Sequence, residues 1–530
     1  ILCLSASGQG EVDLTIDLRH VRPQGKRIRG FGGIADPTAL RDMFPRLAKI
    51  LNGAYGRQLT AKEVCLLIDE FALTVVVGNV RRSAGMRQQD QDAPLLKVGL
   101  WKQDEDGNFY MPDPSLDALR MANHTRNYHT KPTLKEVKSA VQSQYDSGEG
   151  AILNVPEAVA RCNVDILPTR EIQKEFIQHW NDARNYLKVA YLLTYDKPIS
   201  DEELEHRLGR YATNPCGEIL GNTLVCNLTE VHLNLLDPHD YIAQKEAFQA
   251  AALAGCALLH LDFEYLDQQK SKEWDPIVGV GATGFFDFFV ALFGVDWLEW
   301  WSLGRPDDWS SEAWPFASPQ SHYFTELERC HLEAWREIVR ETVHSYCTRN
   351  GLKVPNRFTC VKPSGTLSLL TGASPGWHPP KAAYFIRRVT TAVNDPSALA
   401  ALDCGYTIIP GQYDKDENGR LLDDPFDPRV TSWLVEVPMK TPWADLPGAD
   451  KFPPSQFPVE AQFKFMMQIQ KYYTTHNTSA TLEFRKEEID TLSRLVYEAI
   501  RDDEGYVSAA MLARFDCNQT FPRLPFEPIS

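Results

Sequence analysis

The stretch Tyr211-Ala-Thr-Asn-Pro-Cys-Gly-Glu-Ile-Leu220 decides how this chain is interpreted, because it places three reactive groups close together. Asn214 offers an amide, Cys216 a thiol and Glu218 a carboxylate. Proline fixes φ and glycine permits unusual dihedral angles, so Pro-Cys-Gly predicts a tight, ordered loop that aims the thiol. Alternation along an extended loop would place the three side chains on one side, which suits a shared site. The residues alone leave open an ordinary turn with an inert cysteine.

The sequence Asn214-Pro-Cys-Gly-Glu-Ile219 resembles the finger loop of ribonucleotide reductase catalytic subunits. The likeness is greatest to the adenosylcobalamin-dependent class II branch, and within it to monomeric enzymes that reduce ribonucleoside triphosphates. This resemblance implies that Cys216 becomes the thiyl radical that takes the 3′-hydrogen of the substrate. It also implies that Glu218 is the base on the 3′-hydroxyl and that Asn214 holds the ribose hydroxyls. Spacing by itself supports only that the three side chains converge.

The resemblance runs from Val12-Asp-Leu-Thr-Ile16 to Phe521-Pro-Arg-Leu-Pro-Phe526, which is nearly the whole chain. It implies an α/β fold, a ten-stranded α/β barrel with the Cys216 loop at its centre. Repeated units of a helix followed by an apolar strand favour the α/β class independently. We expect residues 1–530 to form this catalytic barrel without the N-terminal portion and the C-terminal redox tail of the family.

The composition of the 530 residues is that of a globular protein, with 43% hydrophobic and 24% charged residues. The net charge of −16 argues against a nucleic-acid polymer or an anionic membrane as partner, although a nucleotide needs only a local phosphate site. No apolar run approaches the length of a membrane span. The eleven cysteines form no CxxC pair, so we expect no metal site, and reduced thiols in a cytoplasmic setting.

A second cysteine, Cys226, follows Cys216 closely in sequence. In the family, two thiols become a disulfide as the ribose is reduced, and the resemblance makes Cys226 one of them. Its partner is expected on the first barrel strand, where no cysteine of this chain fits, Cys3 included. The resemblance also implies a thioredoxin-like reductant, which would restore the thiols.

The segment Lys362-Pro-Ser-Gly-Thr-Leu-Ser368 predicts a phosphate site, because small hydroxyl residues and a glycine at the start of a helix can bind an anion. It resembles the substrate-phosphate loop of the family, and the sequence Gly372-Ala-Ser-Pro-Gly-Trp-His-Pro-Pro380 extends the likeness. Ser364, Gly365 and Thr366 are therefore the predicted phosphate-binding residues of a ribonucleotide substrate.

Two further segments resemble the family's specificity loops, which carry the message of an allosteric nucleotide to the substrate base. One is the glycine-rich segment that includes Gly32 and Gly33, and the other contains Arg81 and Arg82. A mobile surface loop remains the alternative for the glycines.

Adjacent tyrosines, Tyr472 and Tyr473, precede the sequence Thr-Thr-His-Asn-Thr-Ser479, which itself resembles the cobalamin-dependent branch. Paired tyrosines mark reductases whose radical arrives from a separate, metal-bearing ferritin-like subunit. The radical source is therefore either adenosylcobalamin or such a subunit, and the tyrosine pair favours the subunit. Ordinary packing of two tyrosines remains the alternative.

Local patterns predict several elements. Thr60 with Glu63, Thr133 with Glu136 and Ser200 with Glu203 are helix-capping signatures. The remaining predictions are a strand over residues 11–17, a helical stretch over 166–193, a buried strand or turn over 226–230, an aromatic helical block from 284 to 301, a helix over 322–349, and a β-turn at Asp414–Gly419 in place of an EF-hand.

Reduction of ribonucleotides to 2′-deoxyribonucleotides for DNA synthesis is the function that the sequence favours. The alternatives are another radical enzyme on the same barrel, a cysteine hydrolase, and an inactive nucleotide-binding paralogue. A hydrolase needs a histidine partner for Cys216, and the sequence nominates none.

Overall fold

A computed structural model describes residues 15–23, 26, 35, 37–74, 76–77, 80–81, 85–94, 96–97, 100, 102–103, 109–412, 414–417, 420–514 and 523–529. Across these ranges, no helix is long and apolar enough to cross a bilayer. The same ranges contain no group of three or more His, Cys, Asp or Glu side chains placed to hold a metal ion.

Helices account for much of the described chain. Their bounds are α2 Pro37–Gly53, α3 Ala61–Leu73, α4 Leu134–Ser147, α5 Val155–Cys162, α6 Arg170–Gln178, α7 Ala183–Tyr195, α8 Asp201–Leu208, α9 Tyr241–Ala257, α10 Leu266–Trp274, α11 Phe285–Phe293, α12 Val295–Ser302, α13 Gln320–Arg349, α14 Pro396–Asp403, α15 Val459–Tyr472 and α16 Ile489–Arg501.

The strands are short, with bounds β1 Val76–Val77, β2 Val80–Arg81, β3 Gly85–Asp90, β4 Lys102–Gln103, β5 Phe109–Tyr110, β6 Ala122–Tyr128, β7 Ala151–Asn154, β8 Ala212–Thr213, β9 Leu220–Gly221, β10 Leu228–His232, β11 Gly279–Thr283, β12 Tyr384–Ala392, β13 Thr407–Pro410, β14 Ser432–Lys440, β15 Thr481–Phe484, β16 Ser508–Ala513 and β17 Phe526–Pro528.

The central sheet has the order β15-β16-β7-β6-β3. Its strands run parallel within β15–β16 and within β7–β6–β3, and antiparallel where β16 meets β7. A separate parallel pair, β10 and β11, lies alongside residues 359–361 through the bridge Val280–Thr359, and Val361 bridges to Thr478. The fold is thus mixed α/β, as predicted, and the strands are assigned to several small sheets.

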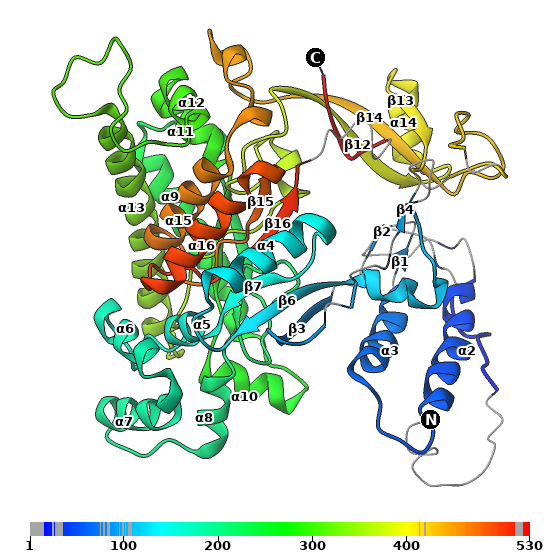
Figure 1. Cartoon of the computed structure of the whole chain (residues 1–530), viewed down its shortest axis with the longest axis horizontal. Coiled ribbons are helices and arrows are strands. Elements are labelled where there is room, and N and C mark those ends of the chain that lie inside the picture. Colours follow the sequence, from blue (N-terminus) through cyan, green and yellow to red (C-terminus); the bar gives the residue numbers. More distant parts are fainter. Residues whose placement is uncertain are drawn as a thin grey trace.

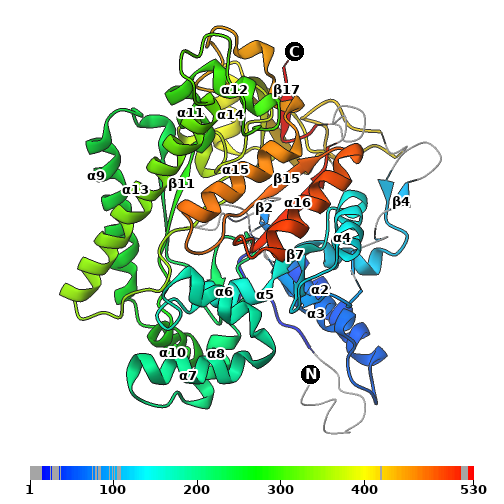
Figure 2. The same ribbon diagram turned by 60° about the vertical axis from the view of Figure 1, so that its left-hand side comes forward.

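Three parts of the molecule can be followed in Figure 1. The central sheet and most helices form the body, while α2 and α3 stand apart from it, where β3 and β6 begin. A second sheet, β13-β14-β12-β17, extends from the body with α14 on it. Figure 2 shows α15 and α16 side by side over β15, on the outside of the central sheet.

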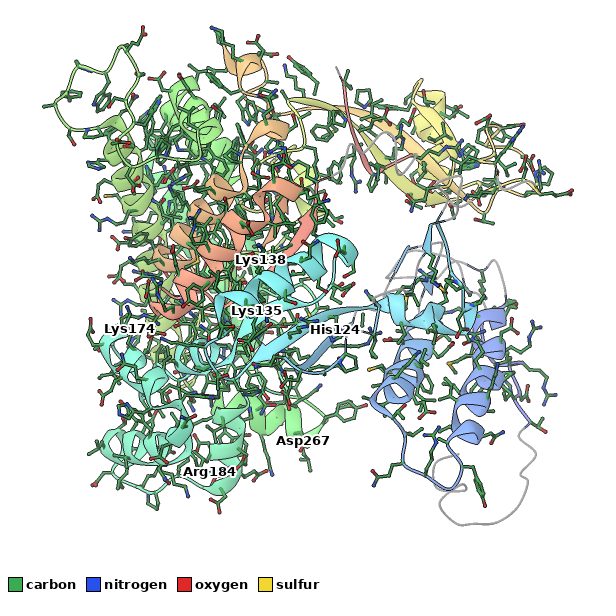
Figure 3. The ribbon with its side chains drawn as sticks, in the orientation of Figure 1. His124, Lys135, Lys138, Lys174, Arg184 and Asp267 are labelled. Carbon is green, nitrogen blue, oxygen red and sulfur yellow. The ribbon has the colours of Figure 1, made fainter. Side chains whose placement is uncertain are left out.

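Aromatic side chains fill the core of the body, as predicted for the block from 284 to 301. Phe285, Phe286 and Trp301 are fully buried, and they pack on residues of α13 and α15. Phe286 and Trp301 meet edge to face with ring centroids 5.1 Å apart, a favourable aromatic geometry. On the outside, Figure 3 shows the exposed Lys135, Lys138 and Arg184 on their helices.

The capping predictions are confirmed at α3, α4 and α8. Thr60 and Thr133 each accept a hydrogen bond from the third helical amide, and Glu63 and Glu136 return the bond to complete a capping box. Ser200 accepts from the amide of Glu203. The long helix predicted over 322–349 is α13, and Gly351 follows it with φ +66°.

Other local predictions need correction. The stretch over 166–193 is two helices, α6 and α7, separated by a short 3-10 turn at Trp180–Asp182. The described residues 15–17 of the strand predicted over 11–17 form no strand, and the rest of it lies outside the described part. At 414–419, Lys415 bridges antiparallel to Leu421, which agrees with a turn, although Asn418 and Gly419 themselves are not described.

Candidate active site

Cys216 lies at the tip of a short hairpin formed by β8 and β9, here called the finger hairpin (residues 212–221). The amide of Gly217 donates to the carbonyl of Asn214 over 2.9 Å, which closes a β-turn with Pro215 and Cys216 at its centre. Gly217 has φ +79°, so glycine suits this position. The side-chain oxygen of Asn214 accepts from the amide of Ile219 over 3.1 Å and stiffens the turn.

The turn changes how the three predicted groups relate to one another. In an extended loop they would share one side, but in this β-turn Cys216 is exposed while Glu218 is 1% exposed. The expectation of simple alternation is therefore wrong, because the chain reverses direction at these residues. Burial raises the pKa of Glu218, and the nearby side chain of Asn214 offsets part of that effect.

Desolvation governs the protonation of two groups in the site, the buried Glu218 and the half-buried Cys226. Burial raises the pKa of Glu218, and one oxygen of its carboxyl has no hydrogen-bond partner in the described chain. Burial also raises the pKa of Cys226 to about 12, with the nearby charges of Glu218 and Cys216 adding to the effect. Cys226 precedes β10, and its thiol is held in the protonated form beside Glu218.

The segment from Asn477 to Ser479 holds the finger hairpin from behind. Ser479 donates to the carbonyl of Cys216 over 2.6 Å, and the side chain of Asn477 donates to the carbonyl of Gly217 over 2.7 Å. The backbone amide of Asn477 donates to the carbonyl of Glu218 over 3.1 Å. This segment lies next to Val361 in the β arrangement, so the hairpin is fixed to the body.

His476 anchors the base of the hairpin. Its Nδ1 accepts from the amide of Leu220 over 3.3 Å, and its Nε2 donates to the carbonyl of Val278 over 3.1 Å. The ring is fully buried, and burial lowers its pKa well below the ordinary value. Both ring nitrogens are therefore engaged, which leaves neither available as a base for Cys216.

Strands β3 and β6 hold the opposite side of the hairpin. The side-chain amide of Gln88 accepts from the amide of Thr213 over 3.0 Å and donates to the carbonyl of Tyr211 over 3.2 Å. Asn123 donates to the carbonyl of Pro215 over 3.0 Å. His124, labelled in Figure 3, is 3% exposed, and neither of its ring nitrogens has a hydrogen-bond partner among the described residues.

The predicted phosphate loop, Ser364–Thr366, has an unexpected neighbour. The hydroxyl of Ser364 donates to the carboxylate of Glu230, which also pairs with the ammonium of Lys362 over 3.1 Å. Ser364 takes a left-handed φ of +53°. The prediction of a helix start is only partly met, because a four-residue 3-10 helix, Leu367–Leu370, follows. Gly365 and Thr366 are exposed, and their amides donate no hydrogen bond within the described chain.

The two tyrosines have different surroundings. Tyr473 is fully buried, and its hydroxyl donates to the carbonyl of Val280 over 2.8 Å. Tyr472 is half-buried, with the charged groups of Arg329 and Lys471 over its ring at 6.0 and 5.5 Å. No ring contact joins the two tyrosines in the described chain.

The predicted specificity loops are only partly covered. Gly32, Gly33 and Arg82 lie outside the described residues. Arg81 belongs to β2, where it pairs with Val76 of β1 in a two-stranded hairpin. This hairpin precedes β3, the strand that carries Gln88 to the base of the finger hairpin.

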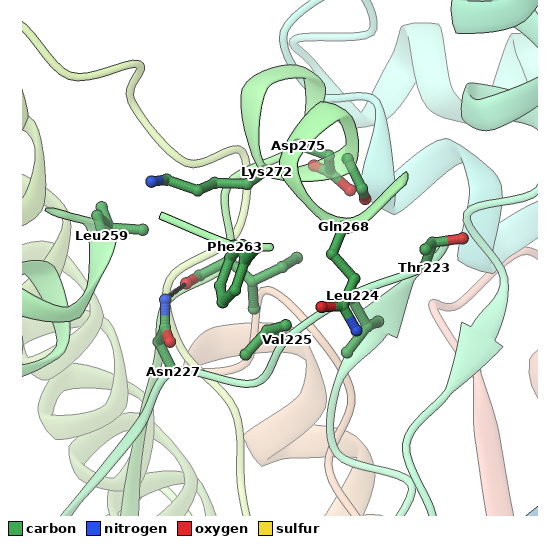
Figure 4. A pocket seen from close by; sticks show the side chains of 11 residues that line it. Thr223, Leu224, Val225, Asn227, Leu259, Phe263, Gln268, Lys272 and Asp275 are labelled. Atoms are coloured by element: carbon green, nitrogen blue, oxygen red, sulfur yellow. Dashed lines mark hydrogen bonds between the residues drawn. The ribbon is translucent and has the colours of Figure 1, made fainter. Parts of the chain in front are cut away.

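A pocket lies beside the loop that contains Cys226. Figure 4 shows Leu224, Val225 and Asn227 on one side and Phe263 and Lys272 on the other. The side chain of Asn227 donates to the carbonyl of Ile277 over 3.1 Å, which fixes the loop at the pocket wall.

Sequence reasoning missed the residues that hold the site together. Gln88, Asn123 and Glu230 carry no local motif, because they reach the site only through the fold. The segment that contains Asn477 and Ser479 resembles the same family as the hairpin does. That resemblance marked the segment, but it did not predict its contact with the hairpin.

No family model matches the chain. The chain is 27% identical over 498 residues to an adenosylcobalamin-dependent ribonucleoside-triphosphate reductase of Lacticaseibacillus paracasei, which covers 92% of this chain and 56% of that protein. It is 26% identical over 488 residues to the enzyme of the same description from Lactobacillus leichmannii, covering 91% of this chain and 56% of that one. The chain thus spans just over half the length of these relatives.

Among solved structures, a crystal structure of a B-12 dependent (class II) ribonucleotide reductase matches with a TM-score of 0.65 and 20% identity. The match covers 96% of this chain and 60% of that one. The homologues of this chain are therefore adenosylcobalamin-dependent ribonucleoside-triphosphate reductases, and it shares its fold with a class II ribonucleotide reductase.

Proposed function

We propose that the chain carries the catalytic centre of a ribonucleotide reductase, which converts ribonucleoside triphosphates into 2′-deoxyribonucleotides for DNA synthesis. One observation carries the proposal: an exposed cysteine at the tip of a fixed hairpin, with a buried carboxyl and a second, half-buried thiol nearby. The homologues act on this substrate class, which adds independent support.

The proposed chemistry assigns one task to each group. Cys216, as a thiyl radical, takes the 3′-hydrogen, while Glu218 accepts the proton of the 3′-hydroxyl and Asn214 positions the ribose. The 2′-hydroxyl then leaves as water. Two thiols, one of them Cys226, supply two electrons and two protons and become a disulfide, which a thioredoxin-like dithiol reduces again. A raised pKa makes Glu218 a stronger base than an ordinary glutamate, which suits this role.

We propose adenosylcobalamin as the radical source, in preference to the ferritin-like subunit that the tyrosine pair favours. Bound to the enzyme, it would supply the radical that takes the hydrogen atom from a thiol at close contact. The exposed side chain of Cys216 fits a group that must approach from outside. The phenol of Tyr473, by contrast, is bound to a backbone carbonyl and has no ring contact with Tyr472 among the described residues.

The finer fold is proposed to be a ten-stranded barrel around the finger hairpin. Its support is an unbroken order of neighbours, namely β10, β11, residues 359–361, residues 478–484, β16, β7, β6 and β3. Hydrogen bonds reach the hairpin from β3, at one end of this order, through Gln88, and from the segment that leads into residues 478–484, through His476.

The remaining sites are proposed on the same basis. The phosphate loop would bind the substrate triphosphate through the exposed amides of Gly365 and Thr366, with Ser364 shaping the loop. The hairpin that contains Arg81, with Arg82, Gly32 and Gly33, would contact an allosteric nucleotide. A cytoplasmic setting suits the described cysteines, which are thiols and not disulfides. The hydrolase alternative lacks support, since both nitrogens of His476 are engaged.

The test uses the full-length enzyme with a ribonucleoside triphosphate, a dithiol reductant and adenosylcobalamin. We expect deoxynucleotide formation without a second protein. Formation only after a metal-bearing subunit is added would replace the proposed radical source. No formation under either condition would overturn the function.

A further inference from the structure

Consecutive carbonyl groups at the tip of the finger hairpin are all bound from outside the hairpin. The acceptors are the carbonyls of residues 215 to 218, and the donors are Asn123, Ser479 and Asn477, the last through both its side chain and its backbone amide. The donors come from two segments far apart in the sequence, β6 and residues 477–479. A turn that is fixed on both sides cannot rotate its peptide groups independently.

Each bond fixes the orientation of a group that the proposed reaction needs. The carbonyl of Cys216 belongs to the residue that carries the thiol, so Ser479 fixes the direction in which that side chain leaves the turn. Asn477 binds the carbonyls of Gly217 and Glu218, which flank the Cα of Glu218, and so fixes the backbone that carries the carboxyl. Asn477 and Ser479 are 3% and 8% exposed, so water does not readily replace them.

We infer that Asn477 and Ser479 are positioning residues for Cys216 and Glu218. The inference rests on the proposed function and assigns two further residues to it. Both side chains donate to backbone carbonyls of the hairpin. They act through the backbone, because they hold the carbonyls of Cys216, Gly217 and Glu218 in one orientation. The exposed thiol and the buried carboxyl therefore keep a fixed position relative to each other. A misplaced reacting group slows the chemical step more than it weakens substrate binding.

The test compares Ser479→Ala and Asn477→Ala with their conservative partners, Ser479→Thr and Asn477→Asp. Ser479→Thr keeps the donor, whereas Asn477→Asp keeps the size and loses the amide N–H. Thr474→Val is the matched control, because it removes a buried hydroxyl, just before residues 477–479, whose partner is Thr478 and not the hairpin. Unfolding temperatures show which variants are folded.

In the full-length enzyme, we expect Ser479→Ala to lower kcat on the order of 100-fold with little change in KM, as for a misplaced reacting group. Ser479→Thr should restore most of kcat, and Thr474→Val should retain it. A second readout needs no turnover: alkylation of Cys216 by iodoacetamide, followed by peptide mass spectrometry. Its rate should change in Ser479→Ala and in both Asn477 variants, but not in Thr474→Val.

The inference is overturned if the Ser479 and Asn477 variants match Thr474→Val in kcat and in the alkylation rate. It is also overturned if they lose activity only in proportion to lost stability. If the wild-type enzyme forms no deoxynucleotide, the proposed function fails, while the alkylation rates still decide whether these residues position Cys216.

Discussion

The finger hairpin and the phosphate loop use their backbone in opposite ways. In the finger hairpin, the carbonyls from Pro215 to Glu218 are bound by donors from the body, so the tip is held in one geometry. In the phosphate loop, the amides of Gly365 and Thr366 donate no bond within the described chain, and both residues are exposed. The comparison teaches that a reactive group needs fixed surroundings, whereas a site for an anion needs donors that are still free.

The largest effect is expected when the reactive thiol at the tip of the finger hairpin is removed. Cys216→Ser should abolish deoxynucleotide formation, because a hydroxyl does not replace a thiol as the radical. The unfolding temperature should stay within a few degrees of the wild type, since the side chain is exposed and the turn is held by backbone groups. Product analysis and a melting curve check both parts, and substantial residual turnover would count against the assigned role.

Cys226→Ser separates the role of the hairpin thiol from that of the half-buried one. We expect a block of repeated turnover with dithiothreitol or thioredoxin, because the disulfide that accompanies reduction cannot form. Exchange of the 3′-hydrogen should remain, since it needs only Cys216. The measurement is isotope loss from 3′-labelled substrate alongside product formation. Normal multiple turnover would mean that Cys226 is not a reducing thiol.

Gly365→Val tests the phosphate loop. A Cβ at Gly365 would meet no atom within 4 Å in this structure, so the variant should fold normally. Crowding of the exposed amides should raise KM about tenfold, equivalent to about 1.4 kcal/mol of binding free energy. Steady-state kinetics and melting curves provide the measurement.

Gly376→Ala is the contrasting control for that variant. Gly376 has φ +56°, and a Cβ there would lie 2.5 Å from the carbonyl oxygen of Lys362. This variant should lose stability instead of affinity. An unchanged KM in Gly365→Val would rule the loop out as the phosphate site.

Glu230 links the two regions, because it binds Ser364 of the phosphate loop and its charge adds a smaller contribution to the burial that raises the pKa of Glu218. Glu218 acts as a base only when deprotonated, so its raised pKa displaces the acidic limb of activity to higher pH. Glu230→Gln should move that limb toward lower pH, because one nearby negative charge is removed. A pH profile of kcat/KM in both proteins measures the shift, and an unmoved limb would contradict the proposed coupling.

The smallest expected effect is that of Tyr473→Phe. The variant removes the bond from the hydroxyl to the carbonyl of Val280, at a cost of about 0.5–1.5 kcal/mol of unfolding free energy. That carbonyl also accepts from the amide of Cys360, so it keeps a partner. Chemical denaturation measures the cost, and Tyr472→Phe is the matched control. Activity with adenosylcobalamin should persist in both variants, and its loss in either would restore the radical-relay hypothesis.

The sequence predicted local features well where a short pattern has a local cause. The capping boxes at Thr60 and Thr133 and the long helix α13 need only neighbouring residues, and all are confirmed. The motif around Cys216 predicted a tight loop, which the β-turn confirms. It did not predict which side chains would be exposed, because alternation holds only in extended chain.

Long-range contacts were beyond the sequence. The bond between Ser364 and Glu230, 134 positions apart, places a carboxylate beside a segment chosen for binding phosphate. The bonds from Gln88 and Asn477 to the finger hairpin span 125 and 260 positions. Such contacts depend on how the strands pair, which no local spacing encodes.

The neutral, buried ring of His476 makes the stability of the active site sensitive to low pH. In an unfolded chain a histidine takes up a proton near pH 6.5, whereas in the folded protein burial keeps the pKa of His476 well below that value. As the pH falls below about 6.5, the unfolded state therefore gains protons that the folded state cannot, and stability falls by up to about 1.4 kcal/mol per pH unit from this residue alone. The amide of Leu220 donates to the same ring. Mild acid should therefore loosen the hairpin at Leu220 before it unfolds the aromatic core.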